Sequence, residues 1–173
     1  SHQSVRDISA LAAIPNLVLV EPSCEQEVEM LFDWCVNSNQ DSSYIRLTSV
    51  PWPIKFSLPD NYKIQHGQGC ILLPGKEICI IAYGPIPVSL AYESAKLANE
   101  RLGTSVKIIN LPWLNYIDKA WIHEVLDDCN LVISIDNHYR EGGQGSRIGE
   151  ILSENVESKN VFKRIAIDSI PVC

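Results

Sequence analysis

Residues 77–114, EICIIAYGPIPVSLAYESAKLANERLGTSVKIINLPWL, decide the fold of this chain. Residues 78–82 form an almost unbroken apolar run rich in β-branched side chains, as expected for a strand covered on both faces. Beyond Pro87, apolar residues recur every three or four positions, which predicts a helix that ends at Gly103. Residues 106–111 then have the pattern of a second buried strand. Strand, helix and strand with tight connections predict a right-handed βαβ unit in a parallel sheet.

The same alternation of strand and helix patterns surrounds this unit. Residues 70–73 (CILL) predict a short strand that begins the sheet, and residues 131–135 and 164–167 predict two further strands. Helical spacing occurs in residues 118–128 and again after the glycine-rich turn EGGQG at 141–145. Together these elements predict a complete α/β domain of about 95 residues, a common domain size.

The first fifty residues predict a second and incomplete α/β unit. A short helix is followed by a strand at 17–20, a helix that begins after Ser23 and a strand at 44–47. Two strands cannot make a self-sufficient sheet of this type, and their edges would lie open. Either they join the later sheet or part of their domain is missing. Residues 51–76 are rich in proline, glycine and polar side chains, and predict a connection between two domains.

Composition limits the classes of function. Apolar residues make up 46% of the chain, enough for a packed core, and no apolar run reaches the roughly 18 residues that predict a membrane span. A net charge of −7 disfavours a nucleic-acid or anionic-membrane surface, which needs a basic face. The six cysteines include no C-x-x-C pair. We therefore expect a cytoplasmic protein with reduced thiols and without a zinc site.

Several segments, taken in order, resemble the C-terminal part of transketolase-type thiamine-diphosphate enzymes. The first is SHQSVRDISALAAIPNLVLVEPSCEQEVEMLFDW (1–34) followed by YIRL (44–47), which resembles the pyrimidine-binding domain of that family. The second is ICIIAYG (78–84) with VKIINL (106–111). The third is DNHYREGGQG (136–145), whose G-G-x-G also occurs in the related 1-deoxyxylulose-5-phosphate synthases. The resemblance covers nearly the whole chain.

The resemblance implies an α/β chain in two parts. Residues 1–50 would be the C-terminal part of a pyrimidine-binding domain, residues 51–76 a linker, and residues 77–173 a complete transketolase C-terminal-type domain with a mostly parallel sheet. The implied activity is the transfer of a two-carbon ketol unit between sugars, with thiamine diphosphate and Mg²⁺ as cofactors. The implied partner is a second copy of the chain or a separate N-terminal transketolase subunit.

The resemblance also implies that much of the chemistry lies outside this chain. In the family, the Mg²⁺ ligands, the glutamate that activates the aminopyrimidine and the aromatic residues that stack on it belong to the N-terminal portion, and none has a counterpart here. We therefore expect that this chain alone binds no thiamine diphosphate or metal and is inactive. Its own role would be structural and in dimerisation. The start within S-H-Q indicates a fragment of a longer polypeptide more than a natural subunit.

Two residues are matched to substrate-contacting positions. His2 matches the family's catalytic histidine, which donates a hydrogen bond where an oxyanion develops on the substrate; the alternative is a frayed terminal histidine. Arg46 is a candidate substrate-binding residue, because its strand could present it to an anion; the alternative is an ion pair with a surface acid. The family's sugar-phosphate arginine lies three positions later, where this chain has Ser49. A hydroxyl offers one donor where a guanidinium offers two, which predicts a less charged substrate or an arginine from elsewhere.

Other polar groups are given a structural role. The turn at 142–145 precedes a helix, whose free amides could bind an anion, but it lacks the G-x-G-x-x-G pattern. A tight turn for packing or for a subunit contact is therefore favoured. Residues 136–138 (DNH) follow a strand, and we interpret them as an interface or a turn. Trp52, Trp113 and Trp121 are expected to cover the junction between the two domains.

Two alternatives to a transketolase remain open. Within the enzyme class, a 1-deoxyxylulose-5-phosphate synthase or a 2-oxoacid dehydrogenase β subunit is the runner-up, since G-G-x-G favours the synthase whereas S-H-Q and I-P-N favour transketolase. From another class, the chain could be a non-catalytic α/β module that dimerises or binds a small ligand through the turn at 142–145.

Overall fold

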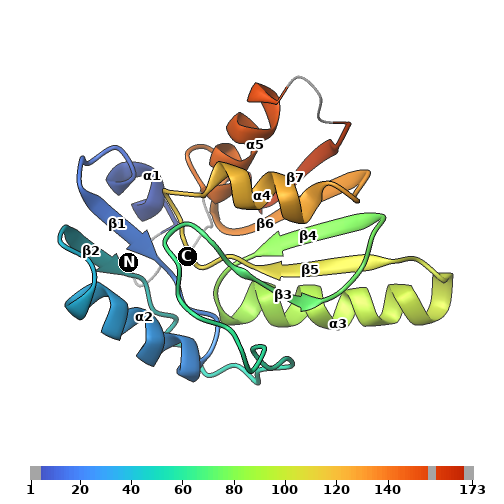
Figure 1. Ribbon diagram of the computed structural model, residues 1–173, viewed down its shortest axis with the longest axis horizontal. Helices are drawn as coiled ribbons and strands as arrows, with labels where there is room; N and C mark the ends of the chain where they lie inside the picture. Colours follow the sequence, from blue (N-terminus) through green and yellow to red (C-terminus); the bar gives the residue numbers. More distant parts are fainter. Residues whose placement is uncertain (1–4, 156–158, 170–173) are drawn as a thin grey trace.

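The computed structural model describes residues 5–155 and 159–169, and within them it contains two separate sheets (Figure 1). The first sheet has two parallel strands, β1 (Leu17–Val20) and β2 (Ser42–Ile45). It is accompanied by α1 (Asp7–Leu11) and α2 (Glu25–Asn37). This is the helix–strand–helix–strand order expected for the first fifty residues.

The second sheet has five strands in the order β3-β5-β4-β6-β7. The strand β3 runs antiparallel to its neighbour, and the remaining pairs are parallel. The strands are β3 (Cys70–Leu73), β4 (Ile78–Ala82), β5 (Val106–Asn110), β6 (Leu131–Tyr139) and β7 (Val161–Ile167). The expected α/β fold with a mostly parallel sheet is confirmed.

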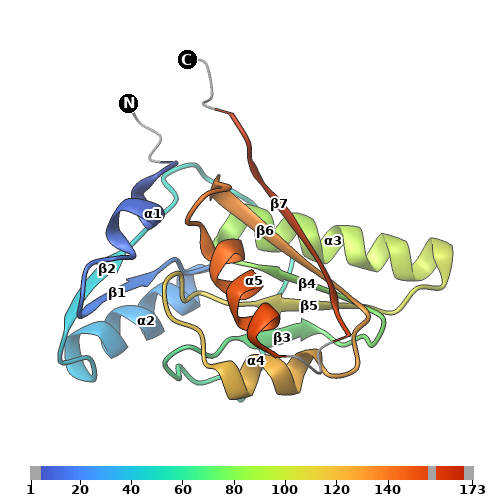
Figure 2. The ribbon, with the colours of Figure 1, turned by 90° about the horizontal axis from the view of Figure 1, so that it is seen from above.

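Helices cover both faces of the five-stranded sheet (Figure 2). One face carries α3 (Pro85–Leu102), and the other carries α4 (Lys119–Leu126) and α5 (Gln144–Glu154). The helix α3 begins with a proline in its first turn and ends at Gly103, whose φ of 65° is left-handed, as predicted. The βαβ unit of β4, α3 and β5 therefore forms as its periodicity predicts.

The two sheets meet without merging. An isolated antiparallel bridge joins Val20 of β1 to Trp113, and the Leu114 amide donates to the Leu19 carbonyl at 2.9 Å. The buried Trp113 ring packs edge-on against Trp34 of α2, with 4.8 Å between the ring centroids. The first two strands thus do not join the later sheet, and Trp113 lies at the junction as expected.

The strand β6 extends further than the sequence predicts. Residues 136–138 were expected to follow the strand, whereas β6 continues through them to Tyr139. Buried and partly exposed positions alternate along all of β6, so that Asp136 and His138 point inward with hydrogen-bonding partners. Periodicity in apolar residues could not reveal this extension, because the inward positions are polar.

The connection between the sheets has no helix or strand from residue 46 to residue 69. It nevertheless packs on the core, because Phe56 and Leu58 are each 8% exposed. Among the residues that the structure describes, no helix combines the length and apolar character that a membrane crossing requires.

Candidate functional site

Arg46 is the centre of a charge network that links the two sheets. It directly follows β2, and its Nε donates to Asp7 Oδ2 at 2.9 Å. Its Nη1 donates both to Glu21 Oε2, just beyond β1, and to Asn137 Oδ1 in β6. One guanidinium therefore links α1, the segment after β1 and the strand β6. We call Asp7, Glu21, Arg46 and Asn137 the junction network.

Glu21 is the buried carboxylate of this network, with a side chain only 1% exposed. Burial raises the pKa of Glu21, and the charge of Arg46 and the hydrogen bonds from Arg46 and Asn137 partly oppose that rise. Asn137 Nδ2 donates to Glu21 Oε1 at 2.7 Å. Gly84 makes room for this oxygen: its φ is +74°, and an added Cβ would lie 2.2 Å from Glu21 Oε1. The carboxyl ends of β1 and β4 are therefore fitted to each other (Figure 1).

The glycine-rich turn holds an anion that belongs to the chain itself. The Gly145 amide, in the first turn of α5, donates to Asp136 Oδ2 at 3.1 Å, and the Tyr83 hydroxyl donates to Asp136 Oδ1 at 3.1 Å. Burial raises the pKa of Asp136, and these hydrogen bonds oppose the rise. Gln144 Nε2 donates to the carbonyls of Leu111 and Trp113 at 2.8 and 2.7 Å. These contacts serve packing, the role that the sequence favoured for the turn.

His138 contacts the first helix from the end of β6. Its side chain is fully buried, and the Ser9 amide donates to His138 Nε2 at 3.3 Å. Because Nε2 accepts, Nδ1 carries the hydrogen and donates to the Tyr139 carbonyl at 2.7 Å. Together with Asn137, this places the D-N-H segment between the N-terminal unit and the five-stranded sheet, which agrees with its interpretation as an interface.

A second buried carboxylate, Glu27 of α2, ties the connection to both sheets. Its Oε2 accepts from the Ser23 amide and hydroxyl, each at 2.7 Å, and its Oε1 accepts from Tyr62 at 3.0 Å and Asn110 at 2.7 Å. Burial raises the pKa of Glu27 despite these four donors. Glu27 is not among the residues that the sequence predicted for a site. Its position four residues before Leu31, in phase with the buried stripe of the helix, could have revealed it.

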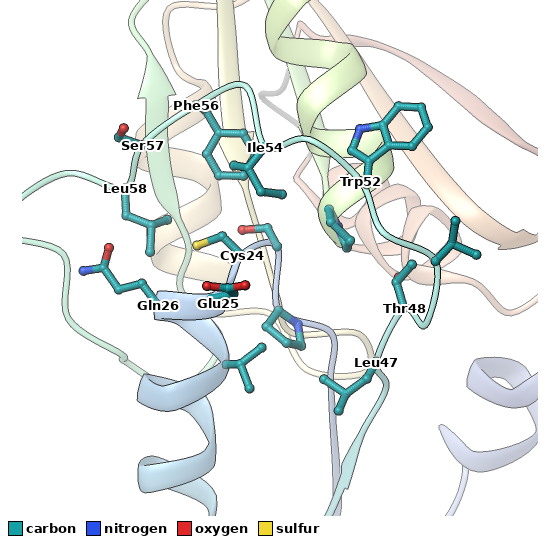
Figure 3. Close-up of a pocket in the computed structure, with 15 residues that line it drawn as sticks. Cys24, Glu25, Gln26, Leu47, Thr48, Trp52, Ile54, Phe56, Ser57 and Leu58 are labelled. Carbon is teal, nitrogen blue, oxygen red and sulfur yellow. The ribbon is translucent and has the colours of Figure 1, made fainter.

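A cavity of about 550 Å³ opens beside the junction network (Figure 3). It lies beyond β1 and β2, between the start of α2, the connection and Pro85 at the start of α3. Ligand sites of open α/β sheets favour the carboxyl ends of strands, and this volume is typical of small-molecule pockets. Thr48 lines the cavity and donates to Glu21 Oε1 at 3.5 Å, so the cavity borders the network. Among the fifteen lining residues only Glu25 is charged.

The structure describes one of the two predicted site residues. His2 lies outside the described residues. Arg46 lies within the junction network, and its guanidinium is directed to Asp7, Glu21 and Asn137. The acids that it meets are buried side chains of the chain itself, not surface acids. Its role toward a substrate stays a prediction.

The described residues do not fit a Mg²⁺-diphosphate group. Within residues 5–155 and 159–169, no three His, Cys, Asp or Glu side chains gather in a way that could hold a metal ion. The Gly145 amide at the start of α5, which could have donated to a phosphate oxygen, already donates to the Asp136 carboxylate.

Comparisons with known proteins cover both parts of the chain. The model of the family "Transketolase, C-terminal domain" matches residues 67–172. One subunit of the apulose-4-phosphate transketolase of Actinobacillus succinogenes is 28% identical over 155 residues, which are 90% of this chain and 48% of that protein. The 1-deoxy-D-xylulose-5-phosphate synthase of Clostridium beijerinckii is 27% identical over 175 residues, 97% of this chain and 26% of the synthase. This chain thus spans about half of the first relative and a quarter of the second.

Solved structures share the fold. A split-gene transketolase, described as an inactive β4 tetramer, superposes with a TM-score of 0.85 and 24% identity over 98% of this chain and 54% of that chain. The transketolase of Campylobacter jejuni superposes with a TM-score of 0.71 and 19% identity over 97% of this chain and 24% of that chain. Both superpositions extend beyond the region that the family model matches and include the two-stranded unit.

Proposed function

This chain belongs to the transketolase family through its C-terminal domain, and we propose that it is the C-terminal portion of an enzyme that transfers a two-carbon ketol unit between sugars. The proposal rests mainly on the share of this chain that its relatives match. The transketolase subunit of Actinobacillus succinogenes is matched over 90% of this chain, although the family model begins only at residue 67. We accordingly assign residues 1–50 to the end of a pyrimidine-binding domain, 51–76 to a linker and 77–173 to the C-terminal domain.

In the proposed enzyme, thiamine diphosphate and Mg²⁺ are held by the N-terminal portion, whether that portion is part of the same polypeptide or a separate subunit. The poor fit of the described residues to a metal–diphosphate group supports this division. This chain would close the pyrimidine-binding domain and fix it to the C-terminal domain through the junction network. His2 is proposed to donate a hydrogen bond to the oxyanion that develops on the substrate carbonyl.

Exposed apolar residues at the rim of the cavity are the basis for proposing a protein partner. Leu47, Val50, Trp52 and Ile54 line the cavity and are 36–62% exposed, which is unusual for four large apolar residues so close in the chain. Large exposed apolar patches mark interaction surfaces. We propose that the N-terminal portion, as a separate subunit or as part of a second copy in a homodimer, covers this rim. The names of the relatives, which include a transketolase subunit and a tetramer, are in line with such an assembly.

The charges near the cavity bear on the substrate. Arg46 is directed to two carboxylates and an amide, Ser49 stands where the family has its phosphate arginine, and the lining carries no cation. We infer that the enzyme takes a less charged sugar or holds a phosphate with residues outside this chain. If the sugar is less charged, steady-state kinetics of the assembled enzyme should give kcat/KM values for xylulose and xylulose 5-phosphate within about tenfold of each other. If residues outside this chain hold the phosphate, the phosphate is preferred and replacing Arg46 leaves that preference unchanged. A large preference for the phosphate, together with loss of that preference on replacing Arg46, would contradict the inference.

The activity itself is tested by reconstitution. Ketol transfer between two sugars is measured for this chain, for the N-terminal portion and for their mixture, and only the mixture is expected to be active. A parallel reaction with pyruvate and glyceraldehyde 3-phosphate separates the alternatives, because the methyl group of a 1-deoxy sugar cannot come from a ketol unit; its product is identified by NMR. Formation of 1-deoxyxylulose 5-phosphate would instead support a synthase, which the similarity to the Clostridium beijerinckii enzyme favours. An assembled complex that produces neither product would support the non-catalytic module.

A further inference from the structure

Two thiols, Cys79 and Cys129, lie together in the core near the amino ends of β4 and β6, away from the cavity at the carboxyl ends. Cys79 is the second residue of β4 and is fully buried; Cys129 stands two residues before β6 and is 4% exposed. The Asn130 amide donates to the Glu77 carbonyl at 2.9 Å, which brings the segment before β6 alongside the start of β4. Both cysteines belong to one apolar cluster, their thiols are close enough to perturb each other's pKa, and the Cys129 thiol donates to Asp128 Oδ1 at 3.5 Å.

A buried cation stands beside this thiol pair. Lys107 of β5 is opposite Cys79 in the strand register and is 5% exposed. Its Nζ donates to Asp128 Oδ1 at 2.5 Å and to the Val125 carbonyl at 2.7 Å. The neighbouring Cys79 thiol and then the charge of Lys107 lower the pKa of Cys129, although burial and the Asp128 carboxylate oppose this; burial raises the pKa of Cys79. Cys129 is therefore the thiol that more readily forms the nucleophilic thiolate.

Cys129 borders a cavity that is large enough for a small molecule. It lines a polar cavity of about 510 Å³ together with His123, Asn130, Asn160 and other polar residues. The Asn160 amide group donates to the Cys129 carbonyl at 2.5 Å, which fixes the backbone of this segment at the cavity wall. Of the two cysteines, only Cys129 lines this cavity, so a small oxidant approaches the pair from the side of Cys129.

A second thiol pair in the chain provides an internal comparison. Cys24 and Cys70 pack in one apolar cluster, but their charged neighbour is the carboxylate of Glu27. Burial and then the negative charge of Glu27 raise the pKa of Cys70 to about 12, and burial likewise raises the pKa of Cys24. These two thiols stay protonated near neutral pH and are poor nucleophiles.

We propose that Cys79 and Cys129 form a peroxide-sensitive dithiol that closes into a disulfide. The Cys129 thiolate attacks hydrogen peroxide, so that an S–O bond forms, the O–O bond breaks and the released hydroxide takes a proton to become water. The Cys79 sulfur then attacks the Cys129 sulfenic acid; an S–S bond forms, the S–O bond breaks and the hydroxyl leaves with the Cys79 proton as a second water. The two sulfurs are oxidised by two electrons in total, and one peroxide is reduced.

The test is thiol mapping of the folded wild-type chain. The chain is treated with increasing hydrogen peroxide, free thiols are blocked with an alkylating agent, and peptides are mapped by mass spectrometry without reduction. We expect a peptide pair that links Cys79 to Cys129, lighter by two hydrogen atoms and separated by dithiothreitol, to form first, while Cys24 and Cys70 remain alkylated. The proposal is overturned if Cys129 proceeds to the sulfinic acid with Cys79 still free, or if another pair links at least as fast.

Variants test the role of the cation and the identity of the pair. Lys107→Gln should slow alkylation of Cys129 by about threefold to tenfold, whereas Lys107→Arg should keep most of the wild-type rate. Glutamine and arginine both have a polar end group, but only arginine keeps the positive charge. Cys35→Ser, a matched control in α2, should leave the link intact. Equal alkylation rates in Lys107→Gln and wild type, with both chains folded by circular dichroism, would contradict the role of Lys107. Should a variant fail to fold, the wild-type map still decides the proposal.

Discussion

Replacing Arg46 by methionine should weaken the junction between the two sheets. Methionine keeps an unbranched apolar stem of similar length but removes every donor of the guanidinium. Glu21, with 1% of its side chain exposed, loses its cationic partner, and Asp7, with 7% exposed, loses its ion pair. The perturbation therefore leaves two buried carboxylates with fewer partners, while the packing volume changes little.

The expected cost follows from the burial of these groups. Breaking a buried ion pair by removing one partner costs about 3–5 kcal/mol, because the remaining charge stays out of water. Arg46 itself is 16% exposed, and Glu21 can take up a proton instead of staying charged. We therefore expect the lower end of the range, about 3 kcal/mol, in the free energy of unfolding near neutral pH. The cost should shrink toward about pH 5, where Glu21 is more readily protonated.

Urea unfolding followed by tryptophan fluorescence measures this cost, because the Trp34–Trp113 contact lies at the junction. The matched control is Arg147→Met, which breaks a surface ion pair with Glu150 in α5 whose side chains are 45% and 61% exposed. That change should cost no more than about 1 kcal/mol. A cost for Arg46→Met below about 1 kcal/mol, or equal to that of the control, would refute a stabilising role of the junction network.

Three further predictions concern the buried carboxylates and their surroundings, each measured as the free energy of unfolding. Burial raises the pKa of Glu21 above its ordinary value of 4.5. The protonated group therefore contributes fully to the free energy of unfolding below pH 4.5, and this contribution is lost as the pH rises through the raised pKa. Glu21→Gln should flatten that decline. Gly145→Ala should cost about 2–4 kcal/mol, because the added Cβ would lie 2.4 Å from the buried Ser134 hydroxyl oxygen. The comparison is Gly103→Ala, where the space is open but φ is left-handed, and which should cost only about 1–2 kcal/mol. Tyr62→Phe removes one of four donors to Glu27 and should cost about 1–2 kcal/mol; no loss would mean that the other three donors suffice.

Periodicity predicted the architecture because it reports which face of an element is buried. The apolar run of β4, the stripe of α3 and the glycine at its end are local signals, and the structure contains each of them where expected. The predicted end of β6 was wrong because apolar periodicity does not detect a buried face that is made of polar residues. Asp136 and His138 occupy inward positions as polar groups, and their hydrogen bonds to Tyr83 and Ser9, which are far away in the sequence, make that placement favourable.

The junction network could not be predicted from the sequence. Glu21 and Asn137 are 116 residues apart, and nothing in either segment indicates that an amide of β6 completes the coordination of a carboxylate beyond β1. From the sequence, Arg46 could serve either an anion site or an ion pair with a surface acid. The structure adds that its acidic neighbours are buried, because the fold brings the carboxyl ends of β1 and β4 together.

Binding of thiamine diphosphate tests the central claim most directly, namely that this chain is one portion of a larger transketolase-type enzyme. Titration calorimetry with Mg²⁺ present compares this chain alone with its complex with the N-terminal portion. We predict no binding heat for the chain alone and saturable binding for the complex. Stoichiometric binding of thiamine diphosphate to this chain alone would contradict the claim.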